Sequence, residues 1–283
     1  MTTAQVFDDR VCQLGEGPLW HPRLSRFFWF DILGQRLLSR GADGTGEWHF
    51  DRIASAAGWV DDDRLLIATE TGLAVLTLST GDFDDLIAVE ADDPTTRSND
   101  GRADPQGGFW FGTMAKDGKG KNGALYRFYR GEVRKLADPL GIPNSICFAP
   151  NGDVAYLSDT QDQVIWRQAL DAEGWPVGPR HVQLDLSTRD LNPDGAVTDA
   201  DGALCVALWG EGAVARFDAS GAELARWSVG GQHSSCPAFG GPDMDQMIVT
   251  TARDGIENPD AGQGLTYITT PGIRGRAEPC VTL

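Results

Sequence analysis

The sequence predicts an all-β fold, a six-bladed β-propeller that residues 1–283 form as a single domain. Six similar segments recur along the chain at intervals of roughly 37 to 50 residues, a spacing typical of propellers and solenoids. Each segment has two short apolar runs joined by tight turns. The 35 glycines and 15 prolines punctuate these runs, and no amphipathic helical stretch of useful length interrupts them.

The repeats place the expected strands in order along the chain. Residues 4–14 are extended but belong to no repeat, so we expect them to add a strand to the last blade and cover its free edge. The apolar runs of the six units are 27–30 with 37–39, 65–68 with 73–76, 109–112 with 124–128, 154–157 with 164–167, 203–208 with 213–217, and 247–250 with 265–268.

One position ahead of the first run recurs in each unit. Asn99, Asn144 and Asp194 lie ten residues before Phe109, Val154 and Leu204, respectively. Glu16 falls in the same position with a turn one residue longer, and two weaker copies complete the set. In chain order the six positions are Glu16, Ser55, Asn99, Asn144, Asp194 and Cys236 or Pro237.

These recurring side chains predict a metal site in the central channel. The first strand of each propeller blade lines the channel, so two carboxylates and two carboxamides converge there. Such an all-oxygen set suits one hard divalent cation, such as Ca²⁺, Mg²⁺ or Mn²⁺. The identity of the cation stays open, with Zn²⁺ and Fe²⁺ also considered. A plainer interpretation is that Asn144 and Asp194, each beside a proline, cap turns.

Composition limits the partners and the compartment. A formal net charge of −17 excludes nucleic acid and an anionic membrane surface as partners. Five cysteines without close pairs predict reduced core thiols. The first residues lack a signal-peptide pattern, and no apolar run has the length of a membrane span. We therefore expect a cytoplasmic protein that is a monomer or a weak homo-oligomer.

Five motifs together resemble one family. They are LGEGPLW, RSNDGRADPQGGFWFGTM, GIPNSICFAPNG, NPDGAVTDADGALCVALW, and FGG followed by TTARDG. The combination is similar to the senescence marker protein, regucalcin and gluconolactonase family, six-bladed propellers that hydrolyse sugar lactones. The resemblance implies that Glu16, Asn144 and Asp194 hold the metal, and that Arg97 and Asn99 bind substrate hydroxyls.

One loop departs from this resemblance. Some family members carry a longer loop after the Gly-Thr-Met motif, with a glutamate that touches substrate. Here the loop is short and basic, Lys116 to Asn122, and it contains no glutamate. Which lactone is preferred is left open, and a basic rim that favours an acidic substrate is weighed against a merely solvated loop.

The predicted activity is metal-dependent opening of sugar lactones, such as glucono-, xylono-, arabino- or galactonolactone, to the aldonic acid. The cation polarises the lactone carbonyl and activates water, and Asp194 acts as general base. Two alternatives stay open. One is a propeller that binds calcium or another ligand without turnover, and the other is a phosphotriesterase-like hydrolase.

Overall fold

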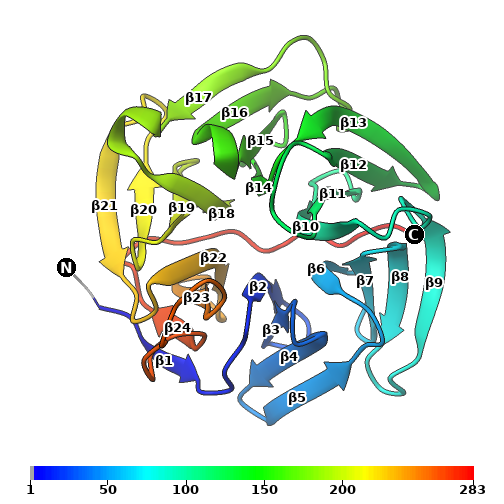
Figure 1. Cartoon of the computed structure of the whole chain (residues 1–283), viewed down its shortest axis with the longest axis horizontal. Coiled ribbons are helices and arrows are strands. Elements are labelled where there is room, and N and C mark those ends of the chain that lie inside the picture. Colours follow the sequence, from blue (N-terminus) through cyan, green and yellow to red (C-terminus); the bar gives the residue numbers. More distant parts are fainter. Residues whose placement is uncertain (1–2) are drawn as a thin grey trace.

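The computed structural model describes residues 3–283 and consists of antiparallel sheets arranged in a ring (Figure 1). Four sheets have four strands each. The first is β2 (Gly15–His21), β3 (Arg26–Asp31), β4 (Arg36–Gly41) and β5 (Gly44–His49). The second is β6 (Ala54–Trp59), β7 (Arg64–Thr69), β8 (Gly72–Thr77) and β9 (Phe83–Ala88). The third is β10 (Thr96–Ala103), β11 (Phe109–Ala115), β12 (Gly123–Tyr129) and β13 (Glu132–Leu140). The fourth is β14 (Pro143–Phe148), β15 (Val154–Asp159), β16 (Val164–Ala169) and β17 (His181–Asp185).

The remaining strands form one eight-stranded sheet. Half of it is β18 (Asn192–Thr198), β19 (Leu204–Trp209), β20 (Ala213–Phe217) and β21 (Glu223–Ser228). The other half is β22 (His233–Gly240), β23 (Gln246–Ala252), β24 (Thr266–Thr269) and β1 (Gln5–Asp8). A single residue pair, Trp209 with His233, joins the halves. The sequence predicts six separate blades. Because this pairing joins two of them, residues 3–283 form five hydrogen-bonded sheets.

The N-terminal strand completes the last sheet, as predicted. β1 runs antiparallel to β24, with Gln5 opposite Ile268 and Val6 opposite Tyr267. β1, at the start of the chain, thereby covers the edge of β24, the last strand of the chain. This arrangement closes the ring without leaving β24 as a free edge.

The first strands of the repeats form the centre of the ring. β2, β6, β10, β14, β18 and β22 each contact the next, and β22 contacts β2. Sheets pack face to face around this centre, so a middle strand is buried on both sides. The FWFGTMA strand, Phe109–Ala115, is accordingly buried throughout and reads as a continuous apolar run without alternation.

The C-terminal segment crosses the middle of the ring, as the red ribbon shows (Figure 1). Its backbone bonds to turns that follow the inner strands. Gly275 donates to the Met244 carbonyl oxygen at 2.8 Å, and Val281 donates to that of Trp59 at 2.8 Å. Glu278 forms an ion pair with buried Arg102 of β10. The segment, called the C-terminal strap below, therefore connects the inner strands at the end of the ring where they finish.

Helical structure in the described residues is limited to two short 3₁₀ turns, η1 (Thr160–Asp162) and η2 (Ser187–Arg189). No helix in residues 3–283 has the length and apolarity needed to cross a bilayer. All five cysteines are free, and all are buried except Cys280. The prediction of reduced core thiols is confirmed for these four.

Candidate functional site

One pocket gathers all five side chains predicted for the site. Glu16 comes from β2, Arg97 and Asn99 from β10, Asn144 from β14, and Asp194 from β18. The pocket encloses about 310 Å³ and opens where the inner strands begin, opposite the C-terminal strap. Ser55 and Cys236, which share the recurring position, are buried and do not line it. Residues far apart in the sequence therefore meet on one solvent-accessible surface.

A β-bulge interrupts every inner strand beside this pocket. In β18, for example, Asp194 and Gly195 together oppose a single residue of β19, between the pairs Pro193 with Leu208 and Ala196 with Val206. The same register shift occurs in the other five inner strands. Bulges bend a strand and re-aim its side chains, so this recurrent feature presents the polar residues to the pocket.

Glycine is required where the bulge of β2 approaches its neighbour. Gly17 has a φ of +52°, and a Cβ atom there would overlap the Ser55 carbonyl oxygen of β6. A side chain at this position would therefore both strain the backbone and push the two inner strands apart. Glu16, the preceding residue, depends on that close packing for its position.

Two of the four carboxylates that line the pocket, Glu16 and Asp194, are buried and incompletely paired. Glu16 is 7% exposed and Asp194 is 5% exposed. Burial, followed by the charge of Asp100, raises the pKa of Glu16 to about 8. Burial, followed by the charge of Glu16, raises the pKa of Asp194. Within residues 3–283, the only hydrogen bond to the Glu16 carboxylate is from the Gly17 amide, at 2.9 Å.

Arg97 places a cation against these carboxylates. Its Nη1 donates to the Ser98 carbonyl oxygen at 2.8 Å and to Asn99 Oδ1 at 2.9 Å. Burial lowers the pKa of Arg97 to about 10, and the charges of Glu16 and other pocket carboxylates act in the opposite direction. Among the described residues, no acceptor bonds to its Nε or Nη2. These N–H groups remain available to a ligand in the pocket.

A directed chain of hydrogen bonds fixes the amide of Asn144. Arg97 can only donate, so Asn99 must present its oxygen to Arg97 and its Nδ2 to Asn144 Oδ1, at 2.9 Å. Asn144 Nδ2 in turn donates to Thr160 Oγ1 at 2.8 Å, and that hydroxyl donates to the Pro193 carbonyl oxygen at 2.7 Å. The bonds from Asn99 and to Thr160 therefore both orient the Asn144 amide so that its oxygen points away from η1.

The donor set fits a hard divalent cation. Glu16 and Asp194 are buried carboxylates with raised pKa values, and a third oxygen, from Asn144, is held in the same pocket. Buried charges that lack a partner are strongly disfavoured, and a cation would supply one. No group of three or more His, Cys, Asp or Glu side chains in residues 3–283 has metal-binding geometry. A third protein oxygen beside the two carboxylates would come from a carboxamide, and Asn144 offers one in the same pocket.

Two residues that the repeat pattern did not single out hold the pocket together. Asp100 Oδ2 accepts from the Ile146 amide at 2.7 Å, and its Oδ1 accepts from the Gly101 amide at 2.8 Å. This carboxylate ties β10 to β14 beneath the pocket. Thr160 links β14 to β18 from a 3₁₀ turn, outside the recurring position. The one signal in the sequence that could have identified Thr160 as a site residue is its position directly after Ser158 and Asp159, which end β15.

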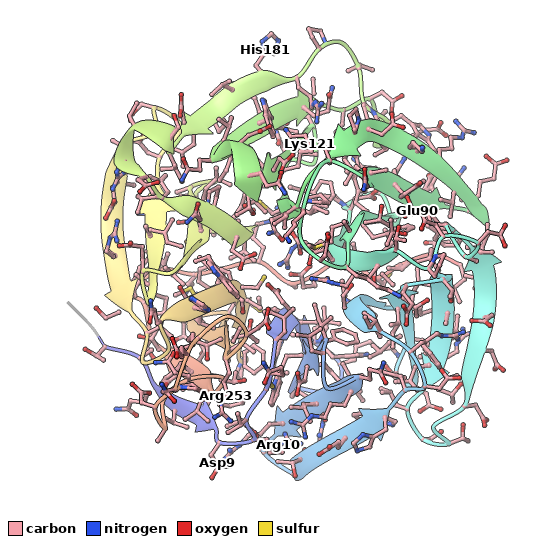
Figure 2. All side chains as sticks on the ribbon, in the orientation of Figure 1. Asp9, Arg10, Glu90, Lys121, His181 and Arg253 are labelled. Atoms are coloured by element: carbon pink, nitrogen blue, oxygen red, sulfur yellow. The ribbon has the colours of Figure 1, made fainter. Side chains whose placement is uncertain are left out.

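The short basic loop is neutralised by distant carboxylates. Lys116 forms an ion pair with Glu70. Lys121, which is labelled in Figure 2, lies 2.7 Å from Asp162 and 3.3 Å from Asp159. Gln161 Nε2 also donates to the loop carbonyl oxygens of Gly118 and Gly120, at 3.2 Å each. The loop is therefore docked on η1, and these two lysines do not form a free cationic rim.

Comparison with known proteins identifies the family. Residues 14–253 match the family described as SMP-30/Gluconolactonase/LRE-like region. The chain belongs to this family. The match covers the inner strands that carry all five pocket residues and confirms the resemblance seen in the sequence motifs.

Relatives within the SMP-30/gluconolactonase family are similar over nearly the whole chain. An L-arabinolactonase of Azospirillum brasilense is 35% identical, covering 92% of this chain and 89% of its own. A pentonolactonase of Haloferax volcanii is 34% identical, covering 93% of this chain and 89% of its own. The crystal structure of a calcium-binding protein, regucalcin, from Agrobacterium tumefaciens superimposes with a TM-score of 0.97 at 36% identity, covering 100% of this chain and 98% of its own.

Replacing Glu16 should stabilise the cation-free protein. The pKa of Glu16 is about 8 in the folded state against 4.5 for the unperturbed group. Between these values the folded state binds more protons than the unfolded state, so stability falls as pH rises. We expect Glu16→Gln in excess chelator to be more stable than wild type by about 4 kcal/mol at pH 8, with little difference near pH 4.5.

Chemical denaturation at several pH values measures this difference. Glu132→Gln, which changes an exposed carboxylate on β13, is the matched control and should show no such pH dependence. A destabilised Glu16→Gln at pH 8, or a difference that does not change with pH, would contradict the stated electrostatics.

Proposed function

We propose that the protein is a sugar lactonase that uses one divalent cation, held by Glu16, Asn144 and Asp194. The observation that carries the proposal is the pocket itself. Two buried carboxylates, a carboxamide oxygen and a guanidinium with N–H groups that bond to no described residue converge there. The names of relatives, L-arabinolactonase and pentonolactonase, support lactones of aldonic acids as substrates. Glucono-, xylono-, arabino- and galactonolactone are the candidates.

The proposed architecture is one domain of six blades over residues 1–283. The eight-stranded sheet then counts as two blades, β18 to β21 and β22 to β24 with β1, which share only the pair Trp209 with His233. The closed succession of inner strands supports this count. Each blade contributes one bulged inner strand to the channel.

The chemistry of ring opening assigns a role to each pocket residue. A bound divalent cation would supply Lewis acidity for the lactone carbonyl and for water. Asp194, which lines the pocket, takes a proton from the attacking water as general base. The water oxygen adds to the carbonyl carbon, the ring C–O bond breaks, and the ring oxygen receives a proton to give the hydroxy acid.

Arg97 and Asn99 orient the substrate in this scheme. Arg97 Nε and Nη2 donate to sugar hydroxyls, which need acceptors and donors in fixed positions. Its Nη1 stays committed to Asn99 and to the Ser98 carbonyl, so the guanidinium plane is set before substrate arrives. Such preorganisation lowers the entropic cost of bringing the carbonyl to the base.

Removing the base should abolish turnover while preserving the fold. We expect Asp194→Asn to lower kcat for a sugar lactone by about a thousandfold or more, since it removes both a base and a predicted ligand. The measurement is proton release during lactone opening, with circular dichroism to verify folding. A folded Asp194→Asn variant with near wild-type activity would overturn the assignment.

Removing the cation should abolish lactone opening reversibly. Protein treated with a chelator should be inactive, and addition of Ca²⁺, Mn²⁺, Mg²⁺ or Zn²⁺ in turn should restore proton release. Cation binding without turnover of any lactone would instead support a calcium-binding module. Faster hydrolysis of an aryl phosphotriester than of every lactone would support the phosphotriesterase alternative.

Thr160 should tune the affinity for the cation without touching it. Thr160→Val removes the hydroxyl that accepts from Asn144 Nδ2, so the Asn144 oxygen loses its fixed orientation. We expect cation affinity to fall about tenfold to a hundredfold. Thr160→Ser keeps the hydroxyl and is the matched control, with affinity within about twofold of wild type. Equal affinity in Thr160→Val would rule out this positioning role.

A further inference from the structure

The outer wall of the pocket carries an aromatic side chain that the reaction scheme does not use. Trp209, at the end of β19, lines the pocket and is half-buried. Its ring stacks on His233 with centroids 4.2 Å apart and an interplanar angle of 22°. The indole is held by this stacking and by packing against the apolar cluster that contains Leu14, and the part of it that stays accessible lines the pocket. A rigid aromatic surface binds apolar faces at low cost in conformational entropy.

A carboxylate lies on the same wall without a partner. Asp254 follows β23, and its backbone is fixed at both ends. Its amide donates to the Gln13 carbonyl oxygen at 3.0 Å, and its own carbonyl oxygen bonds to His233 Nδ1 at 2.9 Å. Its side chain lines the pocket, is exposed, and makes no hydrogen bond or ion pair with any described residue. It is an available acceptor at a defined place.

His233 couples the two features. One edge of its ring bonds to the Asp254 backbone, while its face supports the indole of Trp209. The aromatic surface and the carboxylate are thus positioned by one residue. Arg97 lines the same pocket as Asp254, and the Asp254 charge acts to raise the pKa of the Arg97 guanidinium. The pocket therefore continues from the predicted cation ligands through Arg97 to this wall.

The charges at the pocket mouth favour an uncharged ligand. The lysine of the lining, Lys116, is already paired with Glu70. Asp117 and Asp254 line the same region, and neither forms an ion pair with a described residue. The whole lining carries the four carboxylates of Glu16, Asp117, Asp194 and Asp254 against two cations, and an anionic group beside Asp117 and Asp254 would add to that excess of negative charge. Of the two cations, Lys116 is paired with Glu70, and Arg97 already faces the charges of Glu16, Asp194 and Asp254. A sugar instead offers hydroxyl donors to a carboxylate and a C–H face to an indole.

We propose that Trp209 and Asp254 form a second substrate subsite, which holds the end of the sugar remote from the lactone carbonyl. Trp209 packs against the C–H face, and Asp254 accepts a hydroxyl proton. The subsite selects neutral polyhydroxylated lactones over those with a phosphate, sulfonate or carboxylate at that end. This inference rests on the proposed lactonase function and names its substrate class.

Steady-state kinetics on a neutral and an anionic lactone test the charge selection. Gluconolactone and 6-phosphogluconolactone differ only at the remote end. We expect Asp254→Lys to raise kcat/KM for the phosphorylated lactone about tenfold or more, and to raise KM for gluconolactone several-fold with kcat little changed. Asp84→Lys, an exposed aspartate of β9 outside the pocket, makes the same change in net charge and should alter neither value.

Aromatic variants test the stacking surface. We expect Trp209→Leu to raise KM for gluconolactone about tenfold with kcat within about twofold, because the contact acts equally on substrate and transition state. Trp209→Phe keeps an aromatic face and should stay within about threefold of wild type. Unchanged KM in Trp209→Leu, or loss of kcat alone, would overturn the stacking role.

A binding measurement separates failure of this subsite from failure of the proposed function. Calorimetry with glucitol and glucitol 6-phosphate requires no turnover. Wild type should bind glucitol about tenfold more tightly, and Asp254→Lys should reverse or remove that preference. If wild type opens lactones while the variants match Asp84→Lys, the subsite is wrong and the lactonase proposal stands. If wild type opens none but shows the glucitol preference, the proposed function is wrong and the subsite stands.

Discussion

The bulge in each inner strand is the constraint on which the pocket depends. In a regular antiparallel strand, successive side chains alternate between the two faces and each residue has one partner across the ladder. Two residues opposing one break that alternation and bend the strand. In β10 the bulge lies between Ser98 and Gly101, so Asn99 and Asp100 both leave the regular ladder. Asn99 then lines the pocket while Asp100 ties β10 to β14.

The pocket concentrates unfavourable electrostatics that the rest of the ring must offset. Glu16 and Asp194 line one pocket, burial raises the pKa of both, and the charge of Glu16 raises the pKa of Asp194 further. Their cost is tolerated because the inner strands are packed by large apolar cores between sheets, such as the cluster around Phe109, Phe111 and Phe128. Proteins commonly sacrifice some stability at functional sites in this way.

Much of the fold and of the site follows from the repeat pattern. Turn spacing and apolar runs predict the strands, and the unrepeated start of the chain predicts the outer strand β1, which the pairing with β24 confirms. The recurring position includes four side chains that meet in the pocket, Glu16, Asn99, Asn144 and Asp194, but also Ser55 and Cys236, which do not line it. Long-range contacts between unlike elements carry no such periodic signal. The pair Trp209 with His233, the Thr160 hydroxyl and the neutralising partners of Lys116 and Lys121 all belong to this group.

The most direct measurement is a crystal structure of protein soaked with Mn²⁺, with an anomalous difference map. The account predicts one strong peak in the pocket, with oxygens of Glu16, Asn144 and Asp194 at about 2.0 to 2.3 Å, and space beside it for water or substrate. A map whose only peaks lie on the acidic surface, or a cation bound without Asn144, would contradict the central claim.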